Sequence, residues 1–100
     1  MSTTPEGKVK KQVRDYLRKM GVWFYQPVQN GMGVVGIPDF ICCWHGHFIA
    51  IETKAPGKLS HVTANQQRVI DAIREHGGLA VVVDSVDSLQ VVLEQLEGLQ

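Results

Sequence analysis

The chain has 100 residues, 44% of them hydrophobic, and its ten Lys and Arg balance its ten Asp and Glu. That length builds one domain with a modest core and excludes two independent cores. Six of the ten basic residues fall within residues 8–19, whereas the last 25 residues contain none. An amino-terminal positive patch suits attraction to a phosphate backbone, although a solvated helix face has the same composition.

A disulfide framework and a zinc site are both unexpected. The only cysteines, Cys42 and Cys43, are adjacent in a predicted strand, so their side chains point to opposite faces. The four histidines lack the paired spacing of zinc ligands. With no secretory signal and no apolar run near 18 residues, we expect no contact with a membrane and an intracellular, cytoplasmic protein.

A first helix is predicted from about Pro5 to Met20, capped by Thr3 or Thr4 and ended by a glycine. Its buried stripe consists of Val9, Val13, Tyr16, Leu17 and Met20. Glu6 lies on this stripe, so its carboxylate leans toward the sheet. Because Thr3-x-x-Glu6 also reads as a capping box, the pattern leaves both roles of Glu6 open.

A short strand over Val22–Pro27 precedes a loop with three glycines between residues 30 and 36. This loop either lets a nucleic-acid backbone approach closely or forms a mobile tip. Two apolar runs, Ile37–Trp44 and His47–Lys54, then flank His45-Gly46. A two-residue connection with glycine second predicts a β-hairpin.

The register of this hairpin places two carboxylates opposite each other. If Trp44 faces His47, opposite positions sum to 91, and Asp39 meets Glu52. Directly opposed side chains share a face, and like charges there destabilise the sheet unless a cation lies between them. Lys54 points to the same face. Since Mg²⁺ is usually held by one or two carboxylates with water and phosphate, the pattern indicates a metal site, the alternative being ordinary surface charges.

The carboxy-terminal half supplies a helix, a strand and a last helix. Thr63 opens the second helix, which runs to about His76, with Gln66 facing inward and also completing a possible capping box with Thr63. Leu79–Val83 is apolar throughout, as expected of a central strand buried on both faces. Val86–Leu96 forms the final amphipathic helix. The fold class is α/β, a single-domain mixed sheet flanked by helices in the order αβββαβα.

Pro38-Asp39, twelve further residues and then Glu52-Thr53-Lys54 resemble the signature of the PD-(D/E)XK nucleases. Within that superfamily, GIPDF, IETKAPGKLS and the glutamine helix ending in Gly-Gly are similar to the VRR-NUC group, the virus-type replication-repair nucleases. The resemblance covers nearly the whole chain, residues 1–100 as one domain. It implies a restriction-endonuclease-like fold and, for a chain without an added domain, the stand-alone viral type, found in the host cytoplasm or nucleoid.

The resemblance also implies roles for individual residues. Asp39 and Glu52 would bind Mg²⁺, with Mn²⁺ as a substitute, and the backbone carbonyl of Thr53 and the carboxylate of Glu6 would be further ligands. Lys54 would position or activate the attacking water, and Gln66 would order metal, water or phosphate. The expected activity is structure-specific cleavage of branched DNA in repair, such as a four-way (Holliday) junction, by a homodimer like the junction resolvases.

Six basic residues are candidates for contacts with DNA phosphates that add affinity without sequence information: Lys8, Lys10, Lys11, Arg14, Lys58 and Arg68. Two other classes of protein stay open. One is a DNA-binding module that keeps the nuclease fold without the chemistry. The other is a small structural or interaction protein of the α/β class, which leaves the opposed acids unexplained.

Overall fold

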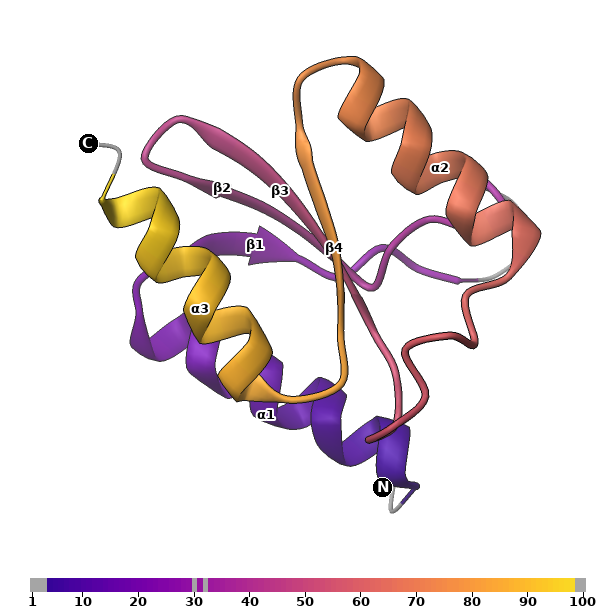
Figure 1. The fold of residues 1–100 in the computed structure, drawn as a ribbon, viewed down its shortest axis with the longest axis horizontal. Helices are drawn as coiled ribbons and strands as arrows, with labels where there is room; N and C mark the ends of the chain where they lie inside the picture. Colours follow the sequence, from indigo (N-terminus) through magenta and orange to yellow (C-terminus); the bar gives the residue numbers. More distant parts are fainter. Residues whose placement is uncertain (1–3, 30, 32, 99–100) are drawn as a thin grey trace.

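The computed structural model describes residues 4–29, 31 and 33–98, and the elements follow the predicted order (Figure 1). The elements are α1 (Pro5–Lys19), β1 (Trp23–Tyr25), β2 (Phe40–Trp44), β3 (His47–Thr53), α2 (Ala64–Glu75), β4 (Leu79–Val83) and α3 (Val86–Glu97). Among the described residues, no helix is both long and apolar enough to cross a bilayer.

Helix α1 begins where its capping residue predicts. The Thr4 hydroxyl accepts a hydrogen bond from the Gly7 amide at 3.0 Å, and Pro5 occupies the first turn. Glu6 therefore sits in the first turn of a helix capped by Thr4, while the alternative cap, Thr3, lies outside the described residues. Val9, Val13 and Leu17 form the buried stripe, and the chain leaves the helix through Gly21 at φ 73°.

The β2–β3 hairpin has the predicted register. Trp44 pairs with His47, and the antiparallel ladder continues to Phe40 opposite Ile51. His45 and Gly46 both have positive φ, 50° and 80°, which is the backbone of a two-residue hairpin turn. Asp39, in the bend just before β2, and Glu52 are the next positions beyond the last ladder pair, so both acids lie at the same end of the sheet.

The four-stranded sheet has the order β1-β2-β3-β4, with β4 parallel to β3 and the other neighbours antiparallel. Helices α1 and α3 cover one face and enclose the larger core, whose sheet residues include Phe40, Ile49 and Ile51. Helix α2 packs on the other face, where Ile70 meets Ile41 and Ala50. The mixed α/β sheet flanked by helices is therefore confirmed.

Three strands differ from prediction in their extent and a fourth in its position. Strand β1 covers Trp23–Tyr25 rather than Val22–Pro27, and β2 begins at Phe40 rather than Ile37 because Pro38 has no amide to donate and Asp39 bends the chain. Strand β3 ends at Thr53, one residue before Lys54. Strand β4 is an edge strand, and its apolar run reflects helices on both of its faces rather than a central place in the sheet.

Candidate functional site

The predicted site residues gather at one end of the sheet, in a cavity of about 350 Å³ where the first turns of α1 and α2 meet the ends of β2 and β3. All five predicted side chains line it: Glu6, Asp39, Glu52, Lys54 and Gln66. A larger apolar groove of about 760 Å³ runs beside it between α2 and the sheet, but no carboxylate lines that groove. The predicted site residues therefore share the smaller, polar cavity.

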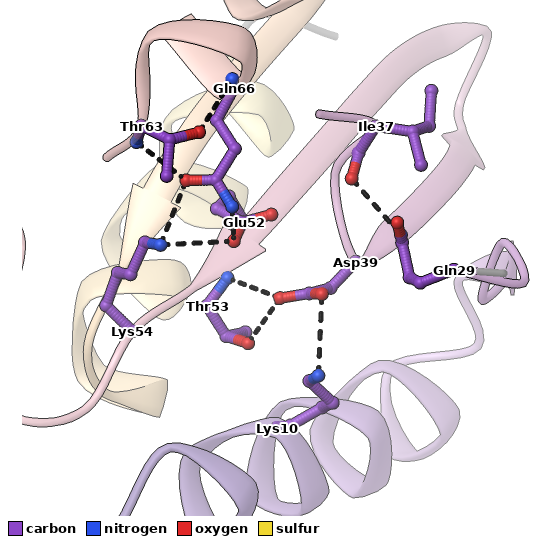
Figure 2. A network of polar contacts seen from close by, with 9 residues as sticks. All are labelled: Lys10, Gln29, Ile37, Asp39, Glu52, Thr53, Lys54, Thr63 and Gln66. Atoms are coloured by element: carbon purple, nitrogen blue, oxygen red, sulfur yellow. Dashed lines mark hydrogen bonds and ion pairs between the residues drawn. The ribbon is translucent and has the colours of Figure 1, made fainter. Parts of the chain in front are cut away.

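Asp39 is held by the residue that follows Glu52. Its Oδ2 atom accepts hydrogen bonds from the Thr53 amide at 3.0 Å and the Thr53 hydroxyl at 2.7 Å. Its Oδ1 atom lies 3.4 Å from Nζ of Lys10 on α1 (Figure 2). Because Thr53 holds Oδ2, the other oxygen of Asp39, Oδ1, has a fixed orientation and faces the Lys10 ammonium.

Glu52 is a buried carboxylate, only 4% exposed. Its Oε2 atom accepts from Nε2 of Gln66 at 3.0 Å and lies 3.5 Å from Nζ of Lys54. Its Oε1 atom is buried and has no hydrogen-bond partner among the described residues. Burial and then the charge of Asp39 raise the pKa of Glu52 to about 7, against the opposing effect of Lys54.

Gln66 caps α2 and also turns its side chain into the cavity. Its Oε1 atom accepts from the Thr63 amide, and the Thr63 hydroxyl accepts from the Gln66 amide, which completes the capping box of α2. The same Oε1 accepts from Nζ of Lys54 at 3.0 Å. Because Oε1 accepts from two donors, the side-chain nitrogen Nε2 of Gln66 faces Glu52 and donates a hydrogen bond to it (Figure 2). The helix cap thus orients the side chain that holds the acid.

Lys54 is almost fully buried and is anchored at both ends. Its backbone amide donates to the carbonyl of Val83 on β4 at 2.9 Å, and its ammonium lies between Gln66 and Glu52. An ammonium can only donate, and both neighbours offer oxygen acceptors. The structure therefore provides a positioned cation beside the carboxylate of Glu52.

The sequence reasoning missed two contacts. It considered only the backbone carbonyl of Thr53, whereas the amide and hydroxyl of Thr53 hold Asp39. It grouped Lys10 with the other basic residues, whereas Lys10 contacts Asp39 directly. Both signals were present: Thr53 lies beside the Asp39–Glu52 position in the register, and Lys10 lies one turn after Glu6 on the same helix face.

The donor set fits a divalent cation. An unpaired buried carboxylate oxygen of Glu52 and a cation-facing oxygen of Asp39 are hard ligands of the kind that Mg²⁺ prefers. Glu6 lines the cavity but is exposed, and its charge is the weakest of the influences on the pKa of Glu52. Within residues 4–29, 31 and 33–98, no three acidic, histidine or cysteine side chains cluster tightly enough to form a metal site by themselves.

The other predicted basic residues lie outside the cavity. Lys8 and Lys11 are exposed on α1, and Lys11 pairs with Asp15 at 2.8 Å. Arg14 is partly buried on α1, and Lys58 is exposed in the loop after β3. Arg68 lines the apolar groove and donates to Asn65. Their role in binding phosphate stays a prediction.

Comparison with known proteins identifies one family. The family model described as the VRR-NUC domain matches residues 5–87. A solved structure described as a VRR_NUC domain is similar to this chain with a TM-score of 0.71 and 23% sequence identity, over 92% of this chain and 97% of that chain. At that identity the structural likeness shows the fold alone. No curated protein matches the sequence.

Gly36 sets the distance between the glycine-rich loop and the start of α2. A Cβ atom there would lie 2.5 Å from the carbonyl carbon of Asn65 and 2.7 Å from the Gln66 amide nitrogen, and φ is 87°. We expect Gly36→Ala to cost about 1 to 3 kcal/mol of unfolding free energy beyond the strain of the positive φ itself, measured by urea denaturation.

Gly77→Ala is the matched control, because Gly77 has a φ of 89° but would have nothing within 4 Å of a Cβ atom. It should lose only about 1 kcal/mol. Equal losses in the two variants would contradict the close approach of the loop to α2.

The burial of Glu52 predicts a pH-dependent stability. Because the folded pKa, about 7, is raised above the unfolded value of 4.5, the stability present below pH 4.5 is lost as pH rises through 7. Between pH 5 and pH 8 in EDTA, the unfolding free energy of wild type should fall by about 2 kcal/mol relative to that of Glu52→Gln. Urea denaturation at each pH measures both unfolding free energies. A stability difference that does not vary with pH would contradict the raised pKa.

Proposed function

The chain belongs to the VRR-NUC domain family, which has a nuclease-type fold, and on that premise we propose that it is a metal-dependent endonuclease of branched DNA. The observation that carries the proposal is the buried, unpaired Oε1 of Glu52, beside Asp39 and with the Lys54 ammonium alongside. Burying an unpaired carboxylate oxygen is costly in a folded protein, so a bound cation is a physical reason to retain it.

Asp39 and Glu52 would hold Mg²⁺, or Mn²⁺ in its place, and the Thr53 carbonyl and Glu6 would complete the ligand set. The bound cation would supply Lewis-acid polarisation of water and of the phosphate. Thr53 keeps Asp39 in place through two hydrogen bonds, and Gln66 does the same for Glu52. These contacts preorganise the two acids, which lowers the cost of assembling the site when DNA binds.

Lys54 would stabilise the negative charge that builds on the phosphate and orient the attacking water. Its ammonium is directed by the Gln66 carboxamide and lies beside a carboxylate, which suits a fixed cation better than a proton acceptor. Gln66 would keep Lys54 and Glu52 at a constant separation. The exposed Lys8, Lys11, Lys58 and Arg68 and the partly buried Arg14 would contact phosphates farther along the DNA.

The first test is cleavage of a labelled four-way DNA junction in Mg²⁺. Asp39→Ala and Lys54→Ala should each reduce the rate by roughly a hundredfold or more, because each removes charge stabilisation at the reacting phosphate. Asp87→Ala, which removes an exposed acid from α3, is the matched control and should cut at the wild-type rate. Unchanged cutting by either site variant sinks the assignment.

A DNA-binding module without chemistry would behave differently. It would bind the junction, release no product in Mg²⁺ or Mn²⁺, and show no calorimetric signal for Mn²⁺ that Asp39→Ala removes.

If the protein cuts DNA, a comparison of four-way, flapped and plain duplex substrates would define the preferred DNA structure.

We propose that the active form is a homodimer, since two symmetric cuts on a junction need two sites. Support comes from the sheet face that α2 covers only in part, where Trp23, Tyr25 and Phe48 are 63%, 50% and 45% exposed. Apolar side chains grouped in this way are typical of protein contact surfaces.

Light scattering should therefore give twice the mass of one chain, and Trp23→Glu should shift the mass to that of a monomer. Val91→Glu places the same charge at an exposed apolar position of α3 and should leave the mass unchanged. A monomer mass for wild type at assay concentration would contradict the dimer.

A further inference from the structure

Lys10 occupies the one oxygen of Asp39 that Thr53 leaves for a cation. The Lys10 ammonium lies 3.4 Å from Oδ1, while both Thr53 donors are bound to Oδ2. The Lys10 side chain is 33% exposed, and the Asp39 carboxylate is 12% exposed. A long, partly exposed stem thus reaches inward from the surface of α1 to a shielded acid (Figure 2).

Lys10 differs from the other lysine of the site in its freedom to move. Lys54 is 9% exposed at its side chain and is held between Gln66 and Glu52. Lys10 has a flexible four-carbon stem with water on one side. Within the described part of the chain, these are the two lysines within 4 Å of Asp39 or Glu52. Lys10 can move away into water, whereas movement of Lys54 would break its contacts with Gln66 and Glu52 inside the protein.

A divalent cation and Lys10 cannot both use Oδ1 without a cost. Two positive charges a few ångströms apart repel each other, and the repulsion is larger in a partly shielded site than in bulk water. Binding of a cation to Asp39 therefore favours loss of the ion pair with Lys10. Glu6 lies one turn before Lys10 on α1, but it is itself a proposed ligand of the metal, so a phosphate of the DNA is the anion that would attract the released lysine in a nuclease complex.

On these grounds we propose that Lys10 is a displaceable counter-ion that couples the binding of DNA to the binding of metal at Asp39. This inference rests on the proposed nuclease function. In the protein without metal, Lys10 neutralises Asp39 and opposes binding of a divalent cation. When DNA is bound, a phosphate draws Lys10 away, Asp39 Oδ1 becomes available and affinity for the metal rises.

The coupling is reciprocal by thermodynamic linkage. If DNA raises the affinity for metal by some factor, metal raises the affinity for DNA by the same factor. The arrangement would make the protein bind metal weakly until substrate is present. Lys10 is thus a positioning residue that acts through Asp39, distinct from lysines that only add affinity for phosphate.

The first experiment measures Mn²⁺ binding to the DNA-free protein by calorimetry. Lys10→Met keeps a stem of similar length and removes the charge, so it should bind Mn²⁺ roughly threefold to tenfold more tightly than wild type. Lys10→Arg keeps the charge and should restore weak binding. Lys19→Met is the matched control, because it removes the same charge from the exposed end of α1 and should stay within about twofold of wild type.

A gain in affinity cannot come from damage to the fold, which would weaken Mn²⁺ binding. If Lys10→Met binds Mn²⁺ no better than wild type, the coupling role of Lys10 is overturned while the metal site stands. If neither wild type nor Lys10→Met shows Mn²⁺ binding that Asp39→Ala removes, the proposed metal site fails and the role of Lys10 fails with it.

The second experiment measures the coupling itself in the Lys54→Ala background, where cleavage is suppressed. The affinity for a fluorescent four-way junction is measured by anisotropy in EDTA and in Mn²⁺. We expect Mn²⁺ to tighten junction binding, and the added Lys10→Met change to reduce that enhancement by roughly threefold or more. The same enhancement with and without Lys10 would contradict the proposal.

Discussion

The register of the β2–β3 hairpin decides whether this chain has a site at all. The turn at His45-Gly46 pairs Trp44 with His47, and every later position follows from that pairing. Asp39 and Glu52 come next after the last ladder pair, and both line the cavity at that end of the sheet. A shift by one residue would turn every side chain of β3 to the other face and take Glu52 away from Gln66 and Lys54.

The elements around the hairpin give the two acids a defined geometry. Thr53 lies on the opposite side of β3 from Glu52, yet its amide and hydroxyl both reach Asp39. Gln66 arrives from α2 and connects Lys54 with Glu52. The two acids are thus each oriented by a neutral donor, which leaves Oε1 of Glu52 without a hydrogen-bond partner among the described residues and Oδ1 of Asp39 facing the Lys10 ammonium.

The polar residues of the cavity have opposing effects on the stability of the fold. A buried carboxylate with an unpaired oxygen destabilises the fold, and the pKa of Glu52 is raised as a result. The capping box of α2 has the opposite effect, because one side chain stabilises the helix start and completes the polar network. The start of α2 and the polar network of the cavity therefore both depend on Gln66. Gly36, in the glycine-rich loop, packs closely on this first turn of α2, so the position of the loop depends on the same turn.

Local patterns in the sequence determined the order of elements and the hairpin register, because period-two and period-3.6 patterns and turn residues are local signals. Asp39, Glu52 and Lys54 were predicted from that register, whereas Glu6 and Gln66 were assigned to the site by the resemblance to the VRR-NUC group. Only the tertiary structure decided that β4 lies at an edge, since apolar content reports covered faces and not strand order. The contacts of Asp39 with Lys10 and Thr53 likewise depend on how α1 and β3 pack at that end of the sheet. Spacing along the chain indicates which residues can meet, whereas the packing of helices on the sheet determines which atoms do.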